Sequence, residues 1–184
     1  MTDHRPTVTD LLRVQHTEVR SLFAQIEQSA ADQRAELFDC LRRLLAVHET
    51  AEEIVVHPAG RRLGDAADQV VDARLREEGA AKQLLADLER LGPDEEGFGS
   101  KFVELRQAVE VHAEAEEQEL FPLLEGELGM GDLRQMGEQV EVAEAMAPTH
   151  PHPHGPESGL GNLLTGPFVA MVDKERDRLH AHAR

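Results

Sequence analysis

The chain has 184 residues, which is enough for one domain with a substantial core and a short appendage. Its 19 Lys and Arg and 36 Asp and Glu give a formal net charge of −17 at pH 7. This charge excludes sequence-independent binding to nucleic acid and argues against binding to an anionic membrane surface. No apolar run approaches the roughly 18 residues of a membrane-spanning helix. The single cysteine cannot form an internal disulfide, so we expect a cytoplasmic protein without nucleic-acid or membrane partners.

The composition favours helices, because Ala, Leu, Glu, Arg and Gln dominate and alternating strand patterns are scarce. Apolar residues recur at helical spacing in four segments of similar length. The first segment is expected to begin at a cap near Thr7 and to end near Ser29. Asp32 is expected to cap the second segment, and Pro58 and Gly60 are expected to stop it.

The third segment is expected from Asp65 to Gly92, and the fourth is expected to begin between residues 94 and 100 and to be closed by Phe121-Pro122. Four amphipathic helices joined by short turns predict an all-α, up-down four-helix bundle, and a shorter fifth helix is expected over residues 132–146. Residues 1–147 are therefore expected to form the bundle with its fifth helix. Residues 148–184 are expected to form a Pro/His/Gly-rich linker and a short C-terminal tail helix.

The second and fourth segments repeat each other. The stretch HETAEEIVVHP from His48 aligns with HAEAEEQELFP from His112 at an offset of 64 residues, and the first and third segments align more weakly at an offset of 63. The bundle is therefore expected to consist of two helical hairpins related by a pseudo-twofold axis. In this register, the counterpart of His16 on the third helix is Gly79.

The repeat contains the candidate site. His48 and Glu52 are four residues apart, as are His112 and Glu116, so each pair lies on one face of its helix. Apolar residues at spacings of three and four place that face in the core, and His16 also points inward. Carboxylates are almost never fully buried unless they are paired or bind a metal. The sequence therefore predicts a metal site made by these three histidines and two glutamates.

Other interpretations of these residues are weaker. A lone inward histidine such as His16 is more often a hydrogen-bonded core residue than a ligand, and a single His-x-x-x-Glu pair is usually a surface pair. Two copies in register on buried faces favour a metal. Glu53 and Glu117 lie five residues past the two motif histidines, so we expect them to turn off this face and to be solvated. Glu49 is left open as a residue at the edge of the site.

These motifs resemble the hemerythrin-like HHE cation-binding domain. The resemblance rests on His16, on His48-x-x-x-Glu52 and on His112-x-x-x-Glu116, and it covers about residues 7–125. It implies a non-haem di-iron centre with two oxo- or hydroxo-bridged irons. In that centre Glu52 and Glu116 would bridge the irons, and the histidines would complete the ligand sets.

One position departs from this family. The resemblance implies another histidine on the third helix, and both the family pattern and the internal repeat put that ligand at Gly79. The expected result is a void beside the site and a labile second iron. Three substitutes stay open: Glu78 could swing in, His57 could contribute from the end of the second helix, or water could fill the gap.

Two functions of different classes follow from this site. The first is a di-iron protein that acts on a small diatomic or peroxide ligand, because histidine and carboxylate ligands with open positions suit iron. Peroxide decomposition, or sensing of oxygen, NO or iron, is then favoured over bulk O2 carriage. The second is a metal-poor or zinc-filled helical interaction module with a vestigial site and an unknown protein partner. Metal analysis separates the two.

Overall fold

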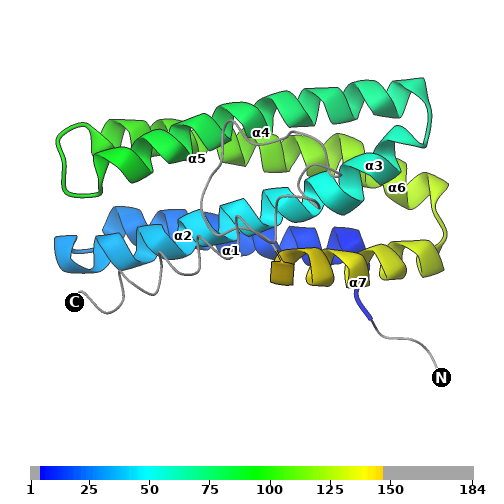
Figure 1. Cartoon of the computed structure of the whole chain (residues 1–184), viewed down its shortest axis with the longest axis horizontal. Helices are drawn as coiled ribbons and strands as arrows, with labels where there is room; N and C mark the ends of the chain where they lie inside the picture. The colour runs from blue at the N-terminus through cyan, green and yellow to red at the C-terminus, as the bar shows by residue number, and fades with distance from the viewer. Residues whose placement is uncertain (1–4, 147–184) are drawn as a thin grey trace.

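Four helical rods lie antiparallel in the computed structural model, which describes residues 5–146 (Figure 1). The rods are α1 (Val8–Gln28), α2 (Ala31–Ala51) with its extension α3 (His57–Arg61), α4 (Asp65–Leu91), and α5 (Phe98–Ala115) with its extension α6 (Phe121–Glu127). A shorter helix, α7 (Met130–Met146), packs along α1 and α2. The predicted all-α, up-down four-helix bundle with a fifth helix is confirmed. The predicted linker and tail at residues 148–184 lie outside the described residues.

The helix ends follow local capping chemistry. Thr7 caps α1, because its hydroxyl accepts a hydrogen bond from the backbone N–H of Asp10 while the Asp10 carboxylate accepts one from the backbone N–H of Thr7. Helix α4 ends where predicted, before Gly92, whose φ of 87° favours glycine. The prediction that Asp32 caps the second helix is wrong. Ala30 occupies that position, and Asp32 lies in the first turn, where its carboxylate still interacts favourably with the helix dipole.

The helices α2 and α5 do not stop at the two prolines. Each passes through a π-helical turn, η1 (Glu52–Val56) or η2 (Glu116–Leu120), and continues as α3 or α6. The predicted stops at Pro58 and Pro122 are therefore wrong, whereas the predicted stop at Gly60 lies one residue before the end of α3 at Arg61. Each proline lies in the first turn of the continuing helix, where proline is tolerated. A Cβ at Gly60 would lie 2.8 Å from Cγ2 of Val71, so this glycine allows α3 to approach α4 closely.

The bundle contains two helical hairpins, α1 with α2 and α4 with α5. Their buried positions correspond at two different offsets in residue number. Residues of α2, η1 and α3 correspond to residues 64 later in the chain, but residues of α1 correspond to residues only 62 later, in α4. The predicted offset of 63 is wrong by one residue, because it pairs the buried Leu12 with the half-buried Leu75. The equivalent buried pairs are Leu12/Arg74, His16/Glu78, Val19/Ala81, Phe23/Leu85 and Ile26/Leu88.

The core consists of two apolar clusters with a polar layer between them. One cluster is rich in phenylalanine and fills the end of the bundle near the α1–α2 and α4–α5 turns, and the other includes the apolar face of α7. Along α1, His16 stands between Leu12 of one cluster and Val19 of the other. The polar layer is therefore enclosed by apolar side chains at both ends. In the part of the chain described, no helix combines the length and hydropathy that a membrane crossing requires.

Candidate metal centre

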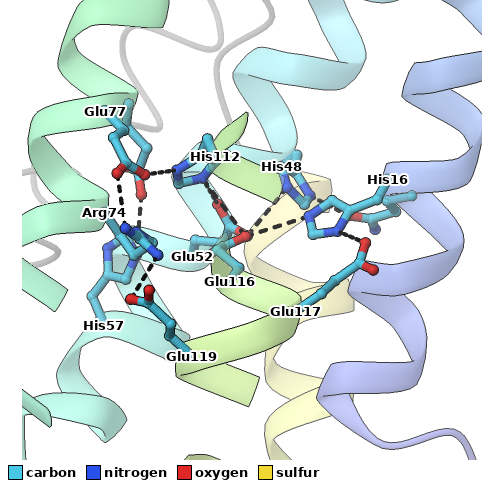
Figure 2. A network of polar contacts seen from close by, with 12 residues as sticks. His16, His48, Glu52, His57, Arg74, Glu77, His112, Glu116, Glu117 and Glu119 are labelled. Carbon is cyan, nitrogen blue, oxygen red and sulfur yellow. Dashed lines mark hydrogen bonds and ion pairs between the residues drawn. The ribbon is translucent and has the colours of Figure 1, made fainter. Parts of the chain in front are cut away.

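The five predicted ligands come from five helical segments and meet in the polar layer (Figure 2). The contributing segments are α1 for His16, α2 for His48, η1 for Glu52, α5 for His112 and η2 for Glu116. None of these residues is more than 6% exposed. The structure therefore brings together all five residues at the centre of the bundle.

The two carboxylates of the layer lie between imidazoles. Oε2 of Glu116 is 3.3 Å from Nε2 of His16 and 3.6 Å from Nε2 of His112. Oε1 of Glu52 is 3.1 Å from Nε2 of His48, and its Oε2 is 4.0 Å from Nε2 of His112. Each carboxylate thus faces two imidazoles, which is the arrangement needed for a carboxylate shared by two ions.

The inward atoms of this layer are poorly satisfied without a cation. Both oxygens of Glu52, both oxygens of Glu116, and Nε2 of His16 and of His112 are buried without a hydrogen-bond partner. Burying a charged group in this way is costly unless the group is paired or binds a metal. Imidazole and carboxylate ligands suit iron and other divalent transition metals. The donor set therefore fits metal ions.

Within residues 5–146, two sets of donor atoms are each compact enough for one ion, with all members of a set within 4.8 Å of one another. The first ion position is the set with two imidazoles and two carboxylates. The second ion position is the set with one imidazole and two carboxylates. Glu52 belongs to both. The sets are His16, His48, Glu52 and Glu116 for the first position, and Glu52, Glu78 and His112 for the second.

Glu78, and not Gly79, faces the site from α4. Glu78 is 1% exposed and both of its oxygens lack a hydrogen-bond partner, whereas Gly79 is exposed to solvent. A Cβ at Gly79 would meet nothing within 4 Å. The expectation of a missing ligand at Gly79 is therefore wrong. Its cause is the register error of one residue, and of the three substitutes left open the structure places Glu78 beside the other donors.

The π-helical turns explain why a second residue from each hairpin reaches the layer. A π turn holds more residues than an α turn, so the fifth residue after each site glutamate returns to the same face. These residues are His57 after Glu52 and Phe121 after Glu116. Nε2 of His57 lies 3.0 Å from Oε1 of Glu78, and the ring of Phe121 stacks on that of His16 with centroids 5.8 Å apart.

Each of the three predicted histidine ligands makes a side-chain hydrogen bond at Nδ1 with a residue outside the five-ligand set, which we call its outer partner. Nε2 of each ring is then left to face the centre. A partner of this kind fixes the ring and tunes the basicity of the ligand. Sequence reasoning missed Gln15 and Glu77, which are equivalent at the offset of 62. The contacts are His48 to Gln15 at 2.6 Å, His112 to Glu77 at 3.2 Å and His16 to Glu117 at 2.9 Å.

The prediction that Glu53 and Glu117 are solvated is wrong for Glu53 and holds in part for Glu117, whose side chain is 29% exposed. Glu53 is 4% exposed and pairs with Lys82 of α4, while Glu117 contacts Arg20 of α1 as well as His16. The two ion pairs are equivalent in the two hairpins. The π turn rotates the residue after each site glutamate toward the neighbouring helix, which a regular helical period does not anticipate.

Charge balance in the layer depends on protons when no cation is bound. Although burial lowers the pKa of His48, the neighbouring Glu52 and Glu116 outweigh that effect and raise it to about 9. Burial, and then the neighbouring Glu52 carboxylate, raise the pKa of Glu116. Burial raises the pKa of Glu49 to about 8. A bound cation would take over this balancing role and release protons from the imidazoles.

A small cavity lies against the polar layer on the side of the phenylalanine-rich cluster. Its volume is about 20 Å³, measured as the space open to the centre of a water molecule. A space of about 10–15 Å³ on this measure holds one water, so the cavity accepts only a very small molecule. The lining comprises His16, His48, Glu78 and His112 with Glu49, Arg20 and Glu110 on its polar side, and Val19, Leu45, Ala81, Val109 and Ala113 on its apolar side.

Comparisons with known proteins match most of the chain. The family described as hemerythrin HHE cation binding domain matches residues 7–124. An uncharacterized hemerythrin-like protein of Schizosaccharomyces pombe is 29% identical over 136 residues, which make up 73% of this chain and 67% of that protein. A DNA nickase of Nostoc sp. is 26% identical over 139 residues, which make up 75% of this chain but only 39% of the nickase.

A solved structure supports the same fold. The crystal structure of a hemerythrin HHE cation binding domain-containing protein from Mycobacterium kansasii is similar with a TM-score of 0.68 and 22% sequence identity. The similarity covers 76% of this chain and 86% of that chain.

Proposed function

Because this chain belongs to the hemerythrin HHE cation-binding family, we propose that it is a non-haem di-iron protein that acts on a small oxidant such as peroxide, O2 or NO. One iron would occupy the first ion position and the other the second, with Glu52 shared between them. Glu116 also serves both, because it faces an imidazole of each position. We also propose a reducing, cytoplasmic location, because the single cysteine of the chain cannot form an internal disulfide.

The observation that carries this proposal is the buried layer of unsatisfied donors. Three imidazoles and three carboxylates are directed at one another, and most of their inward atoms are buried without a hydrogen-bond partner. Such a layer is unfavourable in a chain that never binds a cation, because an unpaired buried carboxylate costs more than a hydrophobic replacement. The layer is therefore best explained as a preformed metal site.

The chain's own residues then define the chemistry of the site. Bound iron supplies a Lewis acid and a redox couple. The outer partners at Nδ1 hold the imidazoles in place, and the apolar wall of the cavity excludes bulk water from the reacting face. A cavity of about 20 Å³ matches molecules of the size of peroxide, O2 or NO.

Turnover of a small oxidant, or sensing of it, fits this site better than bulk O2 carriage. The two ion positions contain three imidazoles in total, and the second position has a carboxylate from Glu78 where the family resemblance implies a histidine. An ion with few protein ligands keeps open positions for exchange. We therefore favour peroxide-decomposing or peroxidase-like activity. Sensing of oxygen, NO or iron is the second candidate function of the same site.

Metal analysis tests the proposal directly. Protein reconstituted anaerobically with Fe2+ and passed through a desalting column should retain about two irons per chain. On exposure to air it should develop near-ultraviolet absorption, which is easy to detect because the chain has no Trp and no Tyr. Protein that retains only zinc, or no metal, with unchanged thermal stability would instead establish the alternative of an interaction module with a vestigial site.

The DNA nickase activity named for the Nostoc relative is not part of the proposal. The matched region is 39% of that protein, and the present chain carries a net charge of −17. Duplex DNA binding depends on cations that replace counterions along the phosphates. The charge therefore argues against a nucleic-acid partner.

A further inference from the structure

The cavity beside the ion positions meets solvent along one edge. Of the residues that line it, all but two are at most 8% exposed. The two are Arg20 of α1 and Glu110 of α5, whose side chains are 40% and 38% exposed. Within residues 5–146, the wall of the cavity therefore reaches the surface between these two side chains.

The equivalent edge of the bundle, between α4 and α2, is closed. At the offsets of 62 and 64 residues, Arg20 corresponds to Lys82, and Glu110 corresponds to Ala46. The side chain of Lys82 is 20% exposed and pairs with the buried Glu53, and Ala46 is 5% exposed. Neither Lys82 nor Ala46 belongs to the lining of the cavity. The two halves of the bundle thus differ, and only the edge between α1 and α5 connects this cavity to the surface of the described chain.

Arg20 is held at this edge by an exposed ion pair. Its guanidinium lies 3.0 Å from Oε1 of Glu117, whose side chain is 29% exposed. Glu110 pairs with Arg106 of its own helix, at 2.8 Å. Exposed ion pairs of this kind contribute little to stability. The Arg20 side chain can therefore swing away from the edge at low cost, while Glu117 keeps its contact with His16.

The charges at this edge suit an uncharged molecule. A cation from α1 and an anion from α5 flank it, so an ion of either sign meets one attractive and one repulsive charge. The net charge of −17 disfavours the approach of anions further. The volume of about 20 Å³ behind the edge limits the size of the molecule that enters.

We propose that the edge between Arg20 and Glu110 is the entrance through which a small uncharged oxidant such as hydrogen peroxide reaches the ion positions. Arg20 is the gate of this entrance and determines specificity, because its side chain covers the opening and limits the size of the molecule that passes. The inference rests on the proposed function, since it names the route to that site and the class of oxidant that takes it. It assigns Arg20 no contact with an ion.

Thiol labelling of metal-free protein tests the gate without any turnover. A cysteine is placed in the cavity wall by A81C, in a C40S background that removes the exposed native cysteine. It is then labelled with methyl methanethiosulfonate. Because access limits the reaction of a buried thiol, adding R20A should raise the labelling rate about 10-fold. The control R43A removes an arginine of similar exposure, 42%, that does not line the cavity, and it should leave the rate unchanged.

Iron-loaded protein with its native cysteine and alanine tests the effect on specificity. Specificity is the ratio of kcat/KM for two substrates, and widening the entrance should raise the ratio for tert-butyl hydroperoxide over hydrogen peroxide about 10-fold in R20A. R43A should keep the ratio of wild type. A structural effect of R20A on the ions would instead change both substrates together, and iron content is measured alongside.

The outcomes separate the inference from the proposed function. If wild type retains no iron or turns over no peroxide, the proposed function fails, while the labelling rates still decide whether Arg20 guards the cavity. If R20A labels no faster than the R20 background, or if R43A accelerates labelling as much, the gate is overturned. An unchanged ratio for the two peroxides in an iron-loaded, active R20A protein would also overturn the assigned specificity.

Discussion

The carboxylate of Glu77 lies 3.2 Å from Nδ1 of His112, and the same carboxylate accepts a hydrogen bond from Arg74. This chain of contacts orients the His112 ring so that Nε2 faces the two central glutamates. Arg74 is itself buried and is the equivalent of Leu12 in the other hairpin. One hairpin therefore supports its histidine with a charged network where the other uses the neutral amide of Gln15.

Replacing Glu77 by Gln should weaken binding of the second ion by about 10- to 100-fold, the usual effect of losing an outer carboxylate partner. Competition with a metal chelator measures the change, and folding is checked by circular dichroism. Glu110→Gln on α5 is the matched control, because Glu110 pairs with Arg106 and not with a site histidine. Equal affinities for wild type and E77Q would show that the contact does not support the ligand.

Replacing Glu116 or Glu52 by Gln should abolish retention of both ions, because each carboxylate faces both ion positions. A ligand at 100 times its dissociation constant stabilises the folded state by about 2.7 kcal/mol, and this gain on adding Fe2+ should disappear in either variant. Thermal melts with and without Fe2+ measure it. A variant that still held two irons and melted like the loaded wild type would disprove the shared carboxylates.

Replacing Lys82 by Met should destabilise the protein by about 3 kcal/mol, because it removes the cation beside the buried Glu53 and Glu49 carboxylates. The equivalent change in the other hairpin, Arg20→Met, should cost less than about 1 kcal/mol, since Arg20 and Glu117 are more exposed. Urea unfolding of the two metal-free variants gives the comparison. Similar losses for both variants would contradict the difference in burial.

The metal-free protein should become less stable as the pH rises from about 6.5 to about 9. The pKa of His48 is raised from 6.5 to about 9, so the folded chain keeps a proton that the unfolded chain has released. Its contribution is fully present below pH 6.5 and is lost as the pH rises through 9. Glu49, whose pKa burial raises to about 8, acts in the same direction.

Urea midpoints at pH 6, 7.5 and 9 measure this dependence. Iron-loaded protein should show a weaker dependence over the same range, because the cation replaces the proton on His48. Stability of the metal-free protein that rises toward pH 9 would show that the layer is not balanced by protonated imidazoles.

Replacing Ala81 by Leu should fill the cavity beside the ion positions and slow peroxide turnover at least 10-fold with iron content unchanged. Overpacking costs about 1–3 kcal/mol in a core, so a thermal melt accompanies the assay. Ala80→Leu, at the neighbouring exposed position, is the control. Unchanged turnover in A81L would mean that the ligand reaches the site by another route.

Much of this architecture follows from local patterns in the sequence. The 3.6-residue period and the spacing of four in His48-x-x-x-Glu52 and His112-x-x-x-Glu116 place both pairs inside the bundle, and the caps at Thr7 and Gly92 set the ends of two helices. These features depend on contacts within a single helix, which is why sequence reasoning predicts them.

The remaining features depend on contacts between helices. The register of α1 against α4 is decided by packing of the two apolar clusters, so a weak match in sequence placed Gly79 where the structure has Glu78. The π turns depend on a balance between backbone hydrogen bonds and the packing of α3 and α6, and a proline six residues after each site glutamate was the available signal. The partners Gln15, Glu77 and Lys82 could be found only once that register was known.

The most direct test of the metal centre is a crystal structure of iron-reconstituted protein with anomalous diffraction data collected on both sides of the iron absorption edge. We predict a strong iron peak among His16, His48, Glu52 and Glu116, and a second metal peak among Glu52, Glu78 and His112. A metal peak at the first position alone would contradict the proposed second iron. The absence of any metal peak within this buried layer would contradict the account.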